Sequence, residues 1–179
     1  MIQAINSKLA KLKKDKKGVM AIEIVIGMFM FLLILCFLVD LTVLAWKFSV
    51  VSQINSKVAR QAGIQGGVLA KAPEGYPGGD NAYTDINELN SMLQEHFENA
   101  GIEGSEWRLS IDGRHVLGSG TRTPSRRIEY RESFQTKIEV TYTWDMISNF
   151  IPGNLTNTIS STRPTLSEWK YDYDNWIGE

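Results

Sequence analysis

A long apolar segment near the N-terminus constrains this chain more than any other feature. No charged or strongly polar side chain occurs from Ile24 to Val39, and after Asp40 the apolar character continues to Trp46. Val19 to Trp46 would form a helix about 42 Å long at ~1.5 Å per residue. That length exceeds the ~30 Å hydrocarbon core of a bilayer, and in lipid the backbone must bond to itself. The segment therefore predicts one transmembrane helix in contact with the lipid bilayer.

The lysines before this segment predict its orientation. Residues 1–17 contain six lysines against one acid, Asp15, so they hold a charge of +5 in a chain whose net charge is −1. Cytoplasmic flanks of membrane helices are enriched in basic residues, so we expect the N-terminus inside and the C-terminal part outside. Because the positive charge is not spread over a folded face, nucleic acid is not an expected partner. These lysines are Lys8, Lys11, Lys13, Lys14, Lys16 and Lys17.

A secretory signal peptide is the first alternative for this segment. Its apolar region usually has ~7–15 residues and ends in a small-residue cleavage site. Here the apolar run is longer, and the stretch after Trp46, "KFSVVSQINSKVARQAG", continues a helical pattern without such a site. Removal of the whole segment is therefore not expected.

Glu23 is costly to place at the start of a membrane helix unless it has a partner. In one interpretation it lies at the headgroups, where the helix dipole favours an acid. The other interpretation begins at Gly18. If the chain were cut after this glycine, Val19 would carry a new ammonium group and Glu23 would become the fifth residue. In a bundle of identical helices, Glu23 of one chain could then pair with the Val19 amine of its neighbour and fix the axial register.

The sequence "KKDKKGVMAIE", followed by the apolar run, resembles the signature of type IV prepilins. That signature combines a Lys-rich leader, a glycine, a glutamate five residues later and a long apolar segment. The resemblance implies a leader that ends at Gly18 and cleavage of the Gly18–Val19 bond by a membrane-embedded prepilin peptidase. It further implies that Glu23 acts in assembly, that the helix packs against other pilin subunits in a filament, and that a membrane platform assembles them.

Asp40 in "FLVDLTVLAWKF", followed by "INSKVARQAG", is similar to TadE-like pseudopilins of tight-adherence pilus systems. The likeness covers about residues 13–66. It departs from the family at Gly27 and Met28, near which those proteins often have a proline. The 179-residue length favours a minor subunit, because major pilins of this type are much shorter. For Asp40 two interpretations stay open: an acid solvated at the outer membrane boundary, or a residue that packs in the assembly.

Beyond the membrane segment, the periodicity predicts that the same helix continues to about Gly66. The residues that form its apolar stripe are Phe48, Val51, Ile54, Val58 and Ile64. The expected organisation is a leader at 1–18, a transmembrane helix at 19–46, an amphipathic extension at 47–71 and an extracytoplasmic domain at 72–179. The predicted class is α+β: a long N-terminal helix, a small antiparallel sheet and one extra helix.

Local signals outline the outer domain. Asp85 can cap a helix whose apolar face is Ile86, Leu89, Leu93, Phe97 and Ala100, and Gly101 can end it. "EWRLSI" and "HVLG" around "DGR" predict a hairpin. Alternation from Ile128 to Trp144 predicts a strand with a turn near 132–133, and "TNTISST" predicts a last strand. The aromatic, acidic tail "EWKYDYDNWIGE" could pack on the sheet or stay exposed.

No residue pattern points to catalysis or to a cofactor. His96 and His115 lie in unrelated elements, and Asp80, Asp172 and Asp174 lack the spacing of a calcium loop. Cys36, the only cysteine, is expected to be a small apolar side chain of the membrane helix. The alternative to a pilin-like subunit is a permanently signal-anchored binding module outside the membrane. A small membrane enzyme would need a polar cluster that the sequence does not offer.

Overall fold

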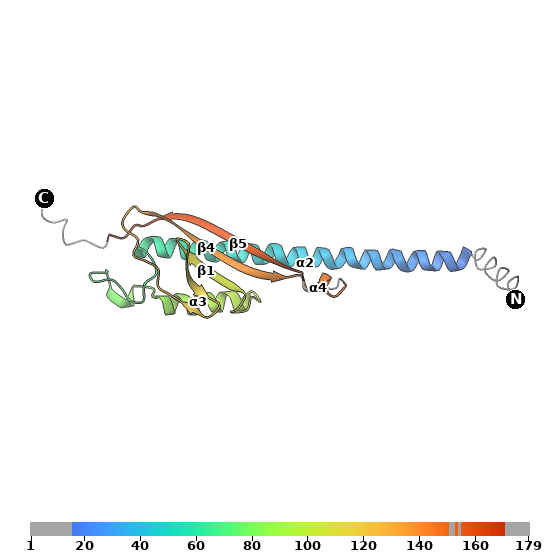
Figure 1. The fold of residues 1–179 in the computed structure, drawn as a ribbon, viewed down its shortest axis with the longest axis horizontal. Coiled ribbons are helices and arrows are strands. Elements are labelled where there is room, and N and C mark those ends of the chain that lie inside the picture. Colours follow the sequence, from blue (N-terminus) through green and yellow to red (C-terminus); the bar gives the residue numbers. More distant parts are fainter. Residues whose placement is uncertain (1–15, 151–152, 154, 171–179) are drawn as a thin grey trace. The chain divides into compact units, whose positions relative to one another are not determined.

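The computed structural model describes residues 16–150, 153 and 155–170 (Figure 1). These residues belong to two units. The first unit contains residues 16–42 and 144–150 together with 153, and the second contains 43–143 and 155–170. The class is α+β, as predicted: a long apolar helix is followed by a five-stranded antiparallel sheet and further helices. The grouping of 144–150 with the membrane helix differs from the prediction, which placed all of 72–179 in one outer domain.

Helix α2 runs without a break from Lys16 to Gln65. It ends where predicted, because Gly66 adopts a left-handed conformation with φ of 67° and the Gly67 N–H donates to the Ala62 carbonyl at 2.8 Å. Glycine enters this conformation without a steric penalty and so provides the usual helix stop. The expected extension at 47–71 is therefore too long by the residues after Gln65.

The sheet has the order β3-β2-β1-β4-β5, and all of its pairings are antiparallel. The predicted hairpin is confirmed, with the turn at Asp112 and Gly113, both at positive φ, as a tight hairpin turn requires. The last predicted strand is also confirmed, and it lies at an edge of the sheet, where Pro164 is tolerated. The strands are β1 Trp107–Ile111, β2 Arg114–Gly118, β3 Thr121–Arg122, β4 Ser133–Thr143 and β5 Thr156–Leu166.

The predicted strand from Ile128 is interrupted where expected. Arg131 has a positive φ of 64°, and the ladder begins only at Ser133. Along β4 the even-numbered residues are buried and the odd-numbered ones are not, as the alternation predicts. Tyr130 precedes the ladder and is exposed, although it shares the parity of the apolar residues.

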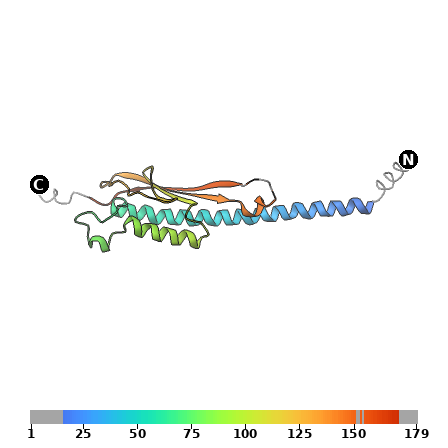
Figure 2. The same ribbon diagram turned by 60° about the horizontal axis from the view of Figure 1, so that its bottom comes forward.

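Helix α3, Ile86–Asn99, and the C-terminal part of α2 lie on the same side of the sheet (Figure 2). The Asp85 carboxylate caps α3 by accepting the N–H groups of Asn87 and Glu88, and Gly101 ends it at a φ of 65°. All five residues predicted for its apolar face are buried. Two shorter helices are η1, Gly79–Asn81, and α4, Asp145–Ser148.

The stripe predicted for the outer part of α2 is only partly right. Phe48 and Ile64 are exposed, whereas Val51, Ile54 and Val58 are buried as expected. The positions between them are filled by side chains that the prediction left out, Asn55, Ala59 and Ala62. Gly63 allows close approach to the end of β5 and the residues after it: an added Cβ would lie 3.0 Å from the Leu166 carbonyl oxygen, and the Glu168 N–H donates to the Gly63 carbonyl at 2.8 Å.

Candidate functional site

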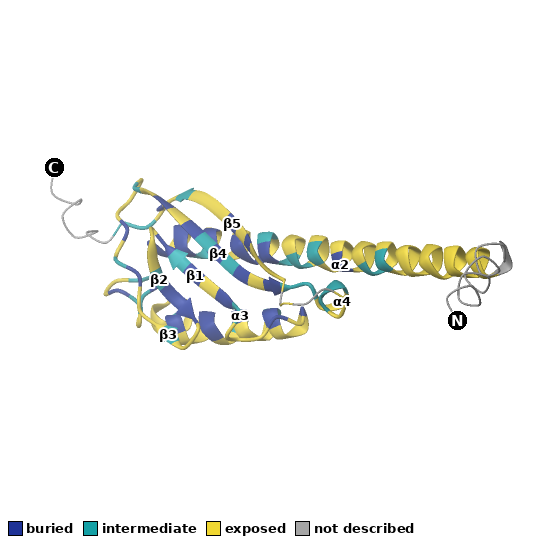
Figure 3. Ribbon diagram, turned by 45° about the vertical axis from the view of Figure 1, so that its right-hand side comes forward, coloured by how far each residue is buried: buried dark blue, intermediate teal, exposed yellow. Residues whose placement is uncertain are grey.

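The first part of α2 has an almost fully exposed surface (Figure 3). Between Gly18 and Val39, every side chain is exposed except those of Leu33 and Cys36, which are half-buried. Of the described residues, only this helix is long and apolar enough to cross a membrane. An apolar surface of this length is unfavourable in water, so the helix is suited to a membrane anchor.

Gly18 and Val19 lie near the described start of this helix. Beyond the neighbouring residues and backbone of the helix itself, no atom of the described residues would lie within 4 Å of a Cβ added to Gly18, and the Val19 side chain is 59% exposed. Backbone and side chain here are therefore open to a partner. Lys16 and Lys17 are the first two residues of α2, whereas Lys13 and Lys14 lie outside the described residues.

Glu23 is exposed on α2. Among the residues whose side chains are described, none forms a hydrogen bond or an ion pair with its carboxylate. Nothing within the described chain therefore offsets the cost of placing this acid beside lipid, and its proposed partner would have to come from elsewhere.

Asp40 is the one fully buried residue of the helix surface between Gly18 and Thr42, with 2% of its area exposed. Its carboxylate accepts the Met146 N–H at 3.2 Å and the Ile147 N–H at 2.9 Å. These are N–H groups of the first turn of α4, which have no partner inside their own helix. The structure therefore shows Asp40 packed within its own chain, and a role of this residue in assembly stays a prediction.

Two aromatic contacts extend this attachment along α2. Phe37 stacks on Trp144 with ring centroids 5.9 Å apart, and Phe29 and Phe150 form a T-shaped pair with centroids 6.2 Å apart. Phe29, Phe37 and Asp40 share one face of a helix with 3.6 residues per turn. We call residues Trp144–Phe150 the 144–150 turn; it is attached to α2 at these three positions. The sequence alone indicated strand character as far as Trp144 and no such contact.

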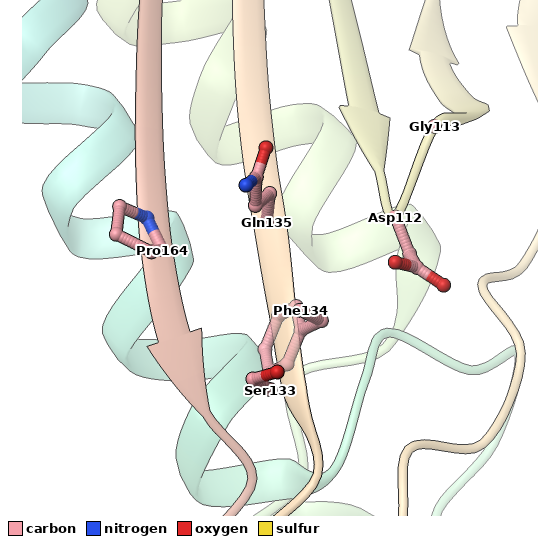
Figure 4. A pocket seen from close by; sticks show the side chains of 6 residues that line it. All are labelled: Asp112, Gly113, Ser133, Phe134, Gln135 and Pro164. Atoms are coloured by element: carbon pink, nitrogen blue, oxygen red, sulfur yellow. The ribbon is translucent and has the colours of Figure 1, made fainter.

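Charges in the second unit are paired around Arg126. Its guanidinium donates to Glu132 at 2.6 Å and to Asp112 at 2.8 Å. Hydrogen bonds to Glu132 and Asp112 keep the pKa of Arg126 above its usual range, and the bond from Arg126 lowers the pKa of Glu132. The Asp112 carboxylate borders a shallow pocket of about 260 Å³ beside Phe134 and Pro164 (Figure 4). Because this acid is already bound to Arg126, the pocket offers no free charged group from it.

The remaining candidate side chains do not gather into a site. Across the described ranges, no three His, Cys, Asp or Glu side chains lie close enough to hold a metal ion. The His115 Nε2 contacts the Leu117 carbonyl oxygen at 2.9 Å, and Asp80 accepts the Ala72 N–H at 3.2 Å. Asp172 and Asp174 lie outside the described residues.

Asn55 is a buried polar residue that the sequence analysis missed. Its Nδ2 donates to the Ser161 carbonyl at 2.8 Å and to the Thr136 carbonyl at 3.3 Å, and so links α2 to β5 and β4. The available signal was a polar residue inside an apolar stripe, between Ile54 and Val58. Such a position calls for a buried hydrogen-bond partner.

Comparison with known proteins adds no relative. No protein-family model, curated protein or solved structure matches this chain. The residues and geometry of α2 therefore carry the functional argument by themselves.

Proposed function

We propose that this protein is a prepilin-like, single-pass membrane subunit, of the minor type found in TadE-like pilus or secretion machines. A prepilin peptidase removes the leader between Gly18 and Val19. The mature helix holds the subunit in the cytoplasmic membrane with its N-terminus inside and its sheet domain outside. An assembly platform then transfers the subunit to other pilin or pseudopilin subunits. This transfer requires an apolar helix surface that packs equally well against lipid and against neighbouring helices.

One observation carries this proposal: apart from its contacts with the 144–150 turn, the first half of α2 has an exposed surface, while its second half is built into a folded domain. Residues 18–39 are exposed, whereas Val51, Ile54 and Val58 of the same helix are buried. The exposed half contains Glu23, for which the described chain offers no partner. An apolar helix with one unpaired acid near its start is what pairing with the amine of a neighbouring subunit requires.

Substitution of Glu23 tests the assembly step. Glu23→Gln keeps the size of the side chain and removes its charge, so insertion and leader cleavage are expected to continue. Incorporation into a filament or pilin complex is expected to fail, because the Val19 ammonium then remains unpaired in a poorly hydrated core. Disulfide or chemical cross-linking between subunits, followed by electrophoresis, measures the incorporation.

A matched control is Gln53→Glu, which alters charge on an exposed position of the same helix outside the apolar segment. This variant should assemble like the wild type. Normal assembly of Glu23→Gln would refute the register role and leave Glu23 as an acid at the headgroups.

A second function from another class is a permanently anchored binding module. The attachment of the 144–150 turn to Phe29, Phe37 and Asp40 favours it, because a covered helix face is less available to neighbouring subunits. Leader cleavage separates the two functions. A permanent anchor has no need to lose its first 18 residues while it keeps its membrane span.

A further inference from the structure

We propose that the 144–150 turn is a second membrane-inserted element, which lies in the outer leaflet against α2 and is held there by Asp40. Its ligand is the lipid acyl chain. The inference rests on the membrane-spanning part of the proposed function and is independent of leader cleavage and filament assembly.

The backbone N–H groups from Met146 to Phe150 meet one requirement of a lipid environment. Irregular backbone is not tolerated in the hydrocarbon region unless its polar groups are bonded within the protein. The Ser148 N–H donates to the Trp144 carbonyl, and the N–H groups of Asn149 and Phe150 both donate to the Ile147 carbonyl. With the two N–H groups bound by Asp40, every backbone donor from Met146 to Phe150 has a partner.

Asp40 supplies the bonds that α4 cannot make for itself. The first N–H groups of any helix lack intrahelical acceptors, and in water such groups would be solvated. Here a carboxylate from within the apolar segment accepts two of them, at 3.2 and 2.9 Å. The buried acid and the free N–H groups at the start of α4 thus satisfy each other. A loop exposed to water would gain little from this arrangement.

The side chains of the turn have the character of a lipid-facing surface. Met146 and Phe150 are 48% and 46% exposed, although each is large and apolar. From Trp144 to Asn154 the only charged residue is Asp145, at the end where the turn leaves β4. Trp144 stands at the same end, and tryptophan favours the boundary between headgroups and hydrocarbon.

The helix sets the depth of insertion. Glu23 at the inner boundary places Asp40 about 25 Å further along α2 at ~1.5 Å per residue, close to the outer edge of a ~30 Å core. Phe29, which contacts Phe150, lies about 16 Å back from Asp40 toward the inner side. The turn therefore reaches from the outer boundary toward the middle of the bilayer. A neighbouring subunit's helix is the competing occupant of this surface.

Thiol accessibility distinguishes lipid from water. In a Cys36→Ala background, which removes the only native cysteine, single cysteines are introduced as Phe150→Cys and Met146→Cys in the full chain. The protein is reconstituted at one chain per lipid nanodisc and treated with a water-soluble maleimide. Both thiols are expected to react at least about tenfold more slowly than Leu166→Cys, because an apolar environment raises the thiol pKa and one unit is a factor of ten in thiolate.

Two reference positions make the result decisive. Leu166 is 57% exposed on β5 and reports on water, and Ile34 is 56% exposed on α2 and reports on lipid. Rapid labelling of Phe150→Cys and Met146→Cys, with slow labelling of Ile34→Cys, would overturn this inference but not the membrane span of α2. Rapid labelling of Ile34→Cys would overturn the membrane span as well. Protection that appears only with two or more chains per disc would replace lipid by a neighbouring subunit and overturn the inference.

The role of Asp40 is tested in the same assay. Asp40→Asn leaves one of the two α4 N–H groups without an acceptor, so labelling of Phe150→Cys is expected to rise toward that of Leu166→Cys. Asp145→Asn removes the adjacent exposed acid and should leave the labelling unchanged. Equal protection in Asp40→Asn and wild type would show that Asp40 does not hold the turn.

Discussion

At the scale of single residues, the polar groups buried in the second unit hold segments distant in sequence. Tyr83 is 2% exposed, and its hydroxyl accepts the Leu69 N–H at 2.9 Å and donates to the Gly67 carbonyl at 3.3 Å. These bonds fix the chain directly after α2. Burial raises the pKa of Tyr83 to about 12 from its ordinary 10.0, so the phenol stays neutral when other tyrosines ionise.

Tyr83 therefore predicts an alkaline loss of stability. Since its pKa is higher in the folded state, its contribution is complete below pH 10 and declines as the pH rises toward 12. Tyr83→Phe should cost about 1 kcal/mol at neutral pH through its lost hydrogen bonds. Its free energy of unfolding should also fall less between pH 10 and 12 than that of the wild type. Urea unfolding in detergent measures both, and parallel pH profiles would contradict this account.

Glu132 predicts the opposite dependence in acid. Arg126 lowers its pKa in the folded state below the ordinary 4.5, so the stabilisation is present above pH 4.5 and disappears as the pH falls through the lowered value. Glu132→Gln should be less stable than the wild type near pH 7 and equally stable in strong acid. Glu103→Gln, at an exposed position, is the matched control. A Glu132→Gln defect that persists in strong acid would show that the charge is irrelevant.

At the scale of elements, those with local signals could be predicted and those with distant contacts could not. α3 followed from its apolar spacing with Asp85 and Gly101 at its ends, and the β1–β2 hairpin followed from "DGR". The attachment of the 144–150 turn to Asp40 joins residues 106 positions apart, and no periodicity reports such a contact. Phe48 and Ile64 were assigned to the buried stripe of α2 because helical spacing shows which residues share one face of the helix. It does not show how far along that face the rest of the domain covers it.

The cap of α3 predicts a measurable effect at this scale. Asp85→Ala removes the acceptor for the Asn87 and Glu88 N–H groups, at 2.7 and 2.8 Å, and should lower the free energy of unfolding by about 1 kcal/mol. Glu95→Ala, on the exposed side of the same helix, should change it little. Denaturant titration followed by circular dichroism compares them. Equal losses in both variants would indicate that the cap contributes nothing.

At the scale of the whole molecule, the order of residues in the chain hides its division into units. The sequence predicted a boundary between the membrane helix and everything after it, whereas residues 144–150 belong with residues 16–42. Between β4 and β5 the chain returns to the first unit. The change in composition there is less marked than the change at Val19. The lysine leader, the glycine, the glutamate and the apolar run all lie within the first 46 residues, so the functional hypothesis could be inferred from local sequence alone.

Intact-mass measurement of the protein extracted from its native membrane tests that hypothesis most directly. A mature chain of 161 residues that begins at Val19 is expected, since 18 of the 179 residues are removed. Gly18→Leu should retain the leader, because a bulky side chain blocks close approach of the peptidase to the backbone. Gly27→Leu, at another open helical glycine, should be cleaved normally. A functional, membrane-resident protein with Met1 or its successor Ile2 still at the N-terminus would contradict the account.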